Sequence, residues 1–177
     1  MPPVQIQIRN LTRQYSGIAN VIISPIEIHN TITGTSEKTH GIWDTGATGS
    51  AITISLAQKL GLTKIGSAKV KGVHGIKYKN VYGVKLVLNS QVEFILPVTE
   101  CDGLTDDGSA EFLIGMDVIS KGDFAISNFQ GQTTMSFRVP SIQRIDFVHQ
   151  NPNDNIDAKN LSRGERRALE RAKKKKR

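Results

Sequence analysis

Apolar and polar residues alternate along much of the chain with a period of two, which is typical of half-buried β-strands. The segment VQIQIR (residues 4–9) alternates at Val4, Ile6 and Ile8. The segment TTMSFRV (133–139) has the same pattern late in the chain. Both segments are therefore predicted to be strands.

A hairpin is predicted at residues 83–98, GVKLVLNSQVEFILPV. Apolar residues alternate on both sides of a turn at Asn89 and Ser90, and they are Val84, Leu86 and Leu88 before it and Val92, Phe94 and Leu96 after it.

Helix signals are short and few. SLAQKLGL has Ser55 as its expected N-cap and Gly61 as its expected C-cap, and MDVISKG is expected to be closed by Gly122. Sixteen glycines suit a turn-rich body. The pattern predicts an all-β, mainly antiparallel fold with two short helices.

Composition limits the class of protein. The chain of 177 residues has about the length of one domain, and its 38% apolar and 22% charged residues are typical of a soluble globular protein. We expect no membrane span, because no window approaches the roughly 20 apolar residues that a spanning helix needs. The N-terminus lacks a signal-peptide pattern and Cys101 is the single cysteine, so we expect a reducing, cytoplasmic location.

The net charge of +7 belongs mostly to the C-terminal end. Residues 1–150 hold 13 Lys and Arg against 12 Asp and Glu, whereas residues 151–177 hold 10 against 4. We expect a folded domain at 1–140, a terminal strand remnant and polar linker at 141–160, and a basic tail at 161–177, helical or disordered. A basic cluster such as residues 163–177 can bind nucleic acid or another polyanion, or can be only a solvated end.

A carboxylate stands at the end of an apolar run in GIWDTGATGSAIT (residues 41–53). On its own, Asp44-Thr45-Gly46 could be a plain turn. The apolar lead-in, the immediate return to strand sequence and a second apolar run ending at Gly115 favour a functional carboxylate instead.

DTGATGSAIT together with FLIGMDVIS resembles the retropepsin-like aspartic proteases. The resemblance spans about residues 1–140 and implies that fold, with one domain per chain. It assigns the catalytic carboxylate to Asp44, support of the dyad to Thr45, Gly46 and Ala47, and a structural motif to Leu113-Ile114-Gly115. No cofactor and no metal are implied.

The stretch VKGVHGIKYKNVYGVKL resembles the glycine-bearing flap hairpin of the family. Gly72, Val73, His74 and Gly75 would lie near its tip and contact substrate. For His74, an exposed turn residue is the competing interpretation.

Hydrolysis by two carboxylates needs one ionised and one protonated group, and a single carboxylate cannot play both roles. The chain has one D-T-G, and TDDGSA (105–110), with Asp107-Gly108, is better explained as an exposed loop. The resemblance therefore implies a two-fold homodimer in which Asp44 meets its symmetry mate.

The preferred function is that of an aspartic endopeptidase acting on extended polypeptide segments. The alternative is a catalytically silent dimerisation or peptide-binding module whose basic tail binds polyanions. The histidines show no metal-ligand spacing, and no phosphate-binding loop motif occurs.

Overall fold

The computed structural model describes residues 7–72, 75–89 and 92–147, together with Arg163, Gly164, Arg167 and Arg171. The chain divides into two compact units, Met1–Ile142 and Gln143–Arg177. The predicted linker falls largely outside the described residues, as does most of the basic tail. No helix in the described part of the chain is long and apolar enough to cross a membrane.

The first unit is mostly β-strand with two short helices, as the alternating pattern predicts. The helices are α1 (Ile54–Lys59) and α2 (Met116–Ile119). The strands are β1 (Arg9–Gln14), β2 (Ile23–Asn30), β3 (Ser36–Trp43), β4 (Ala51–Thr53), β5 (Lys64–Gly72), β6 (Gly75–Val87), β7 (Glu93–Cys101), β8 (Phe112–Ile114), β9 (Asp123–Phe129) and β10 (Gln132–Val139).

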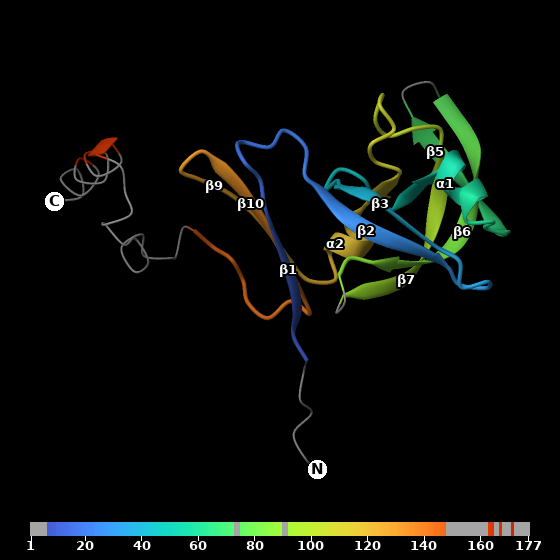
Figure 1. Cartoon of the computed structure of the whole chain (residues 1–177), viewed down its shortest axis with the longest axis horizontal. Helices are drawn as coiled ribbons and strands as arrows, with labels where there is room; N and C mark the ends of the chain where they lie inside the picture. The colour runs from blue at the N-terminus through green and yellow to red at the C-terminus, as the bar shows by residue number, and fades with distance from the viewer. Residues whose placement is uncertain are drawn as a thin grey trace, which may run out of the picture. The chain divides into compact units, whose positions relative to one another are not determined.

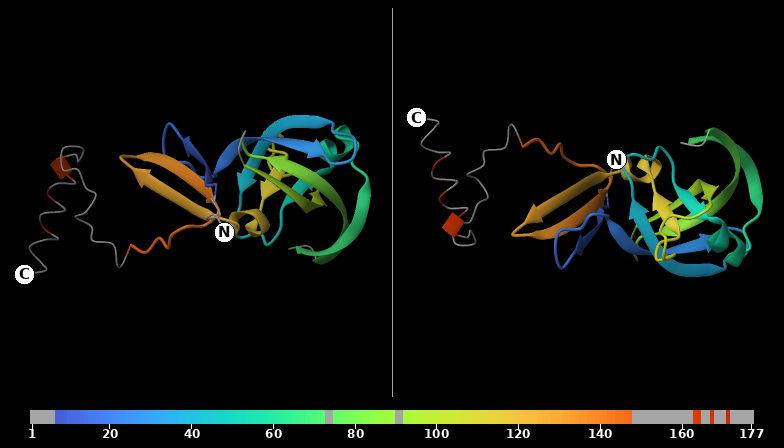
Figure 2. Two further views of the ribbon diagram at one scale, coloured as in Figure 1. Left: turned by 90° about the horizontal axis from the view of Figure 1, so that it is seen from below. Right: turned by 90° about the horizontal axis from the view of Figure 1, so that it is seen from above.

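Two sheets build this unit (Figure 1). The larger has the order β2-β3-β8-β4-β7-β6-β5, and a further pairing of β2 with β6 closes six of its strands into a barrel. The predicted hairpin is confirmed, since β6 pairs antiparallel with β7 around residues 88–92. The smaller sheet has the order β1-β10-β9, and β9 and β10 extend away from the barrel (Figure 2).

The barrel interior is filled by one face of each strand. Its fully buried side chains come from every part of the barrel sequence and include Ile28, Ile52, Val84, Leu86, Val98 and Phe112. Burying side chains of this size stabilises a fold by about 1.5–3 kcal/mol each relative to exposure.

Trp43 joins the two sheets. Its ring stacks on Phe124 with centroids 5.2 Å apart and packs against Phe137 at 5.1 Å. Its indole N–H donates to the Ser24 hydroxyl at 2.9 Å, so the buried donor is satisfied. The last residue of β3 is thereby fixed from both sheets.

The first strand lies later than the alternation of VQIQIR predicts. Val4 and Ile6 fall outside the described residues, and Ile8 is 45% exposed and precedes the strand. Strand β1 pairs with β10 from Arg9↔Val139 to Gln14↔Thr134. Pairing with β10 therefore decides the bounds of this strand, and local alternation does not.

The predicted N-cap of α1 is wrong by two residues. Thr53 is the N-cap, and its hydroxyl accepts from the backbone N–H of Leu56 at 3.3 Å. Ser55 instead donates to the Glu111 carboxylate at 3.2 Å. The predicted C-cap, Gly61, is one residue late: Leu60 is the C-cap, and Gly61 follows it at φ +61°, a conformation that favours glycine.

Gly122 has a different role from the helix end predicted for it. Helix α2 ends at Ile119 with Ser120 as C-cap. The backbone of Gly122 lies directly against the Arg138 carbonyl, where a Cβ atom would not fit. This glycine permits the close approach of two chain segments.

Asp123, the first residue of β9, binds the segment that follows β10. Its side chain is 11% exposed and accepts from Arg138 Nε at 2.9 Å, from the Ser141 hydroxyl and from the Ile142 N–H at 3.1 Å. The Ser141, Ile142 and Arg138 bonds, in that order of effect, lower the pKa of Asp123 from 3.8 to about 2.

We expect Asp123→Asn to lower the melting temperature at neutral pH and to lose this effect in acid. A carboxylate with a depressed folded-state pKa stabilises the fold above its unfolded pKa, near 4, and this stabilisation disappears as the pH falls toward about 2. Thermal unfolding by circular dichroism across that range measures the change, with the exposed loop variant Asp106→Asn as control. A deficit of the same size at pH 7 and at low pH would show that the charge is unimportant.

Candidate active site

The D-T-G loop connects β3 to β4 and holds Asp44 by its backbone. The Asp44 N–H donates to the Ile114 carbonyl at 3.0 Å, and the Asp44 carbonyl accepts from the Ala47 N–H at 3.3 Å. The carboxylate Oδ1 accepts from the Gly46 N–H at 2.8 Å. Asp44 is half-buried while Thr45 and Gly46 are exposed, so the loop presents the carboxylate at a surface.

The second motif, Leu113-Ile114-Gly115, lies directly beside this loop. Strands β3 and β8 pair in parallel, with Trp43 opposite Ile114. The Met116 N–H donates to the Ala47 carbonyl at 2.8 Å. A Cβ atom on Gly115 would lie 2.6 Å from the Gly49 carbonyl carbon, so glycine is required for the two loops to pack.

Ser50 and Asp117 fasten the two loops, and the sequence analysis missed both. The Asp117 carboxylate accepts from the Ser50 N–H at 2.9 Å and from the Ser50 hydroxyl at 2.7 Å. The same hydroxyl accepts from the Gly115 N–H at 3.1 Å, and Ser50 is only 3% exposed. The available signal was a carboxylate two residues after the glycine of the second motif.

A half-buried, largely apolar face extends from the carboxylate across the sheet. Ile42, two residues before Asp44, shares the face of Asp44 and pairs with Leu113, which in turn pairs with Ala51. Ala51 pairs with Thr99. All four side chains are partly exposed, in contrast to the buried residues on the opposite face of the same strands.

The predicted flap sequence forms the hairpin of β5 and β6. Gly72 and Gly75 are the last paired residues at its end, and Gly75 has φ +101°. Val73 and His74 lie outside the described residues, so the predicted substrate contacts of the hairpin tip stay predictions.

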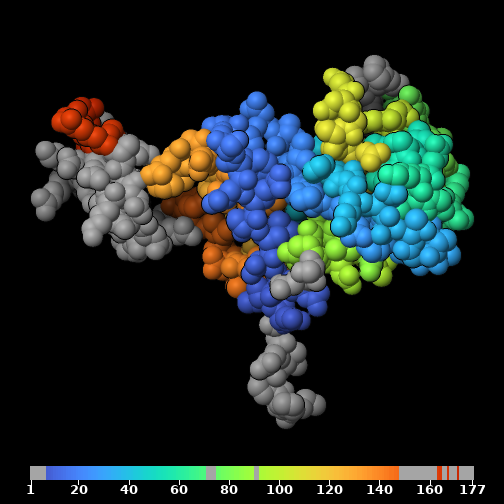
Figure 3. Space-filling model, viewed as in Figure 1, coloured from blue at the N-terminus to red at the C-terminus, as the bar shows by residue number. Residues whose placement is uncertain are grey.

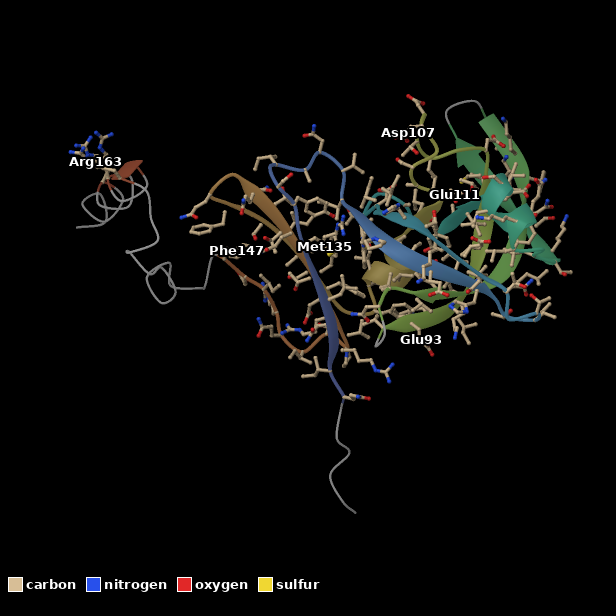
Figure 4. The ribbon with its side chains drawn as sticks, in the orientation of Figure 1. Glu93, Asp107, Glu111, Met135, Phe147 and Arg163 are labelled. Carbon is tan, nitrogen blue, oxygen red and sulfur yellow. The ribbon has the colours of Figure 1, made fainter. Side chains whose placement is uncertain are left out.

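Asp107 lies at the outer end of the loop between β7 and β8, with Glu111 at its base (Figure 4). Its carboxylate accepts from the Ser109 N–H at 2.9 Å, and the bonds from Ser109 and Thr105 lower the pKa of Asp107 to about 2. Gly108 follows at φ +66°. These features are those of a turn carboxylate that stays ionised.

Other reactive chemistry is not assembled in the described part of the chain. Among the described residues, there is no group of three or more His, Cys, Asp or Glu side chains that could hold a metal ion. Burial, as the largest cause, raises the pKa of the Cys101 thiol to about 11. At neutral pH this cysteine is protonated and a poor nucleophile.

Asp117→Ala should lower the free energy of unfolding by about 1–3 kcal/mol, because the buried N–H and hydroxyl of Ser50 would lose their acceptors. Urea titration measures the loss, and Lys121→Ala, an exposed change just after α2, is the control. Equal stability of both variants would mean that the Ser50–Asp117 bonds do not hold the loops.

The chain was compared with known families and structures. A family model described as aspartyl protease matches residues 28–118. No curated protein matches the chain. A retropepsin-like aspartic protease from Rickettsia conorii is 16% identical, with 78% of this chain and 99% of that chain covered at a TM-score of 0.50. EIAV protease complexed with the inhibitor HBY-793 is 17% identical, and the match covers 60% of this chain and 90% of that chain at a TM-score of 0.46.

The family model spans half of the chain and includes both the D-T-G loop and the L-I-G loop. The match to the Rickettsia structure extends over nearly the whole length of that chain and over 78% of this one. The chain belongs to the aspartyl protease family and has the retropepsin-like fold.

Proposed function

We propose that this protein is an aspartic endopeptidase whose catalytic dyad forms from Asp44 of two identical chains. One observation carries the proposal. The two family motifs meet around a single half-buried carboxylate, fixed by backbone bonds to Ile114 and Gly46. The sequence has only one D-T-G, so a second chain is needed to complete a pair.

In the proposed reaction the two carboxylates share one proton, because like charges about 3 Å apart cannot both ionise. The ionised Asp44 takes a proton from water as the water oxygen attacks the scissile carbonyl carbon. The protonated Asp44 donates to the carbonyl oxygen. Return of a proton to the leaving nitrogen then breaks the C–N bond.

The residues next to Asp44 suit a symmetry axis. Thr45 is exposed, and we assign to it a hydrogen bond to the loop of the partner chain. A Cβ atom on Gly46 would lie 3.2 Å from Asp44 Oδ1, so glycine lets the backbone N–H reach the carboxylate. Ala47 offers no side-chain hydrogen-bond donor to the carboxylate.

The substrate is proposed to be an extended peptide lying between the face of Ile42, Leu113 and Ala51 and the β5–β6 hairpin. Half-exposed apolar side chains beside the dyad suit apolar substrate side chains. Gly72, Val73, His74 and Gly75 would close the hairpin over the peptide as a flap. The single cysteine suits a reducing compartment, and we propose a cytoplasmic location.

The alternative, a silent module with a polyanion-binding tail, has one specific observation in its favour. Arg163, Arg167 and Arg171 have helical backbone and are exposed. On a continuous helix, a spacing of four residues would put the three side chains on one face, which would suit phosphate groups. A tail of this kind is equally compatible with an active enzyme, and catalysis decides between the two functions.

Asp44→Asn should reduce kcat/KM on a diverse peptide library by at least about 100-fold, since asparagine cannot act as the base. Mass spectrometry of the digests measures cleavage. Circular dichroism and sedimentation should match the wild type, because the two side chains are nearly the same size. Asp107→Asn, in the exposed loop, is the matched control and should cleave normally. Undiminished cleavage by Asp44→Asn would refute the aspartic mechanism, and a wild type that binds peptides without cleaving any would favour the silent module.

A further inference from the structure

The β5–β6 hairpin has one face continuous with the face of Asp44. Val81 of β6 pairs with Thr99, and Thr99 pairs with Ala51 beside the D-T-G loop. Side chains alternate along a strand, so Lys79 and Lys77 share the face of Val81. We call this face of the hairpin the inner face. A hairpin that covers apolar peptides would be expected to have an apolar inner face, but this one carries lysines.

The opposite face of the hairpin points into solvent. There Tyr78 is 75% exposed and Ile76 is 55% exposed, and Lys69 pairs with Tyr78. On the inner face the Lys79 side chain is only 17% exposed.

The charge of Lys79 is balanced within the chain. Its ammonium group lies 2.6 Å from Asp102 Oδ1, at the start of the loop between β7 and β8. Figure 3 shows this loop standing out from the surface beside the hairpin. The hydrogen bond from Lys79 is the largest cause that lowers the pKa of Asp102, and the charge of Lys77 lowers it further.

Lys77 has no such partner. Among the residues that the structure describes, no carboxylate forms an ion pair with it, and its side chain is exposed. Val70 lies opposite Lys77 on β5 and is 38% exposed. An aliphatic surface next to an ammonium group that forms no ion pair, although it interacts with Asp102 at longer range, matches a side chain with methylene groups and a terminal carboxylate.

We propose that Lys77 makes the enzyme select peptides with an acidic side chain, Glu or Asp, at the position that faces the inner face of the hairpin. This selectivity rests on the proposed endopeptidase function. Substrate that lies under the hairpin excludes water from the pair, which strengthens its attraction relative to an exposed ion pair. We expect kcat/KM to be about 3- to 10-fold higher for Glu than for Gln at that position.

The test uses the full-length protein and a cleaved peptide in which Glu or Gln is placed at each position around the scissile bond. Wild type should prefer Glu at one position, and the preference should shrink as salt is raised from about 0.05 to about 0.5 M. Lys77→Gln should bring the ratio of kcat/KM for the Glu and Gln peptides close to one at that position. Lys69→Gln, on the solvent face of the same hairpin, should keep the preference.

The outcomes separate this inference from the function on which it rests. Cleavage of Glu and Gln peptides at equal rates at every position would overturn the acidic selectivity and leave the endopeptidase function intact. A preference that survives Lys77→Gln, or that Lys69→Gln abolishes, would also overturn it. No cleavage of any peptide by the wild type would overturn the proposed function and the selectivity together.

Discussion

The contact between the loop after β3 and the loop after β8 is the constraint on which the site depends. Glycine at 115 is required for it, because a Cβ atom there would lie 2.6 Å from the Gly49 carbonyl carbon. The contact places the Ile114 carbonyl and the Asp44 N–H 3.0 Å apart. Ser50 and Asp117 then satisfy the polar groups buried between the loops. Backbone packing therefore sets the position of Asp44 and holds it more rigidly than an unpacked loop would.

Features that depend on short stretches of sequence could be predicted. Alternation gave the β6–β7 hairpin, and the two family motifs gave the loops around Asp44. Features that depend on distant partners could not. Asp117 bonds to Ser50 across 67 residues, and although its place after the second motif marks Asp117 as a candidate, no local pattern identifies Ser50 as its partner. The bounds of β1 likewise depend on β10, more than a hundred residues later.

One sheet supplies both the proposed site and the hairpin that we propose covers it. The barrel strands carry the face next to Asp44, and β6 continues the same face into the hairpin beyond the barrel. Trp43 ties the D-T-G loop to the small sheet through Phe124 and Phe137. In the proposed enzyme such an arrangement would separate two tasks: the apolar face next to Asp44 would bind peptides of many sequences, and the charge on the hairpin would restrict the choice among them.

The central claim is that two chains build one catalytic centre. Titration with a tight statine-type peptide, a mimic of the tetrahedral transition state, counts the centres directly when residual activity is followed at high protein concentration. A dyad on a two-fold axis predicts that activity disappears at one inhibitor molecule per two chains. An end-point of one inhibitor molecule per chain would contradict the shared dyad, because each chain would then hold a complete site.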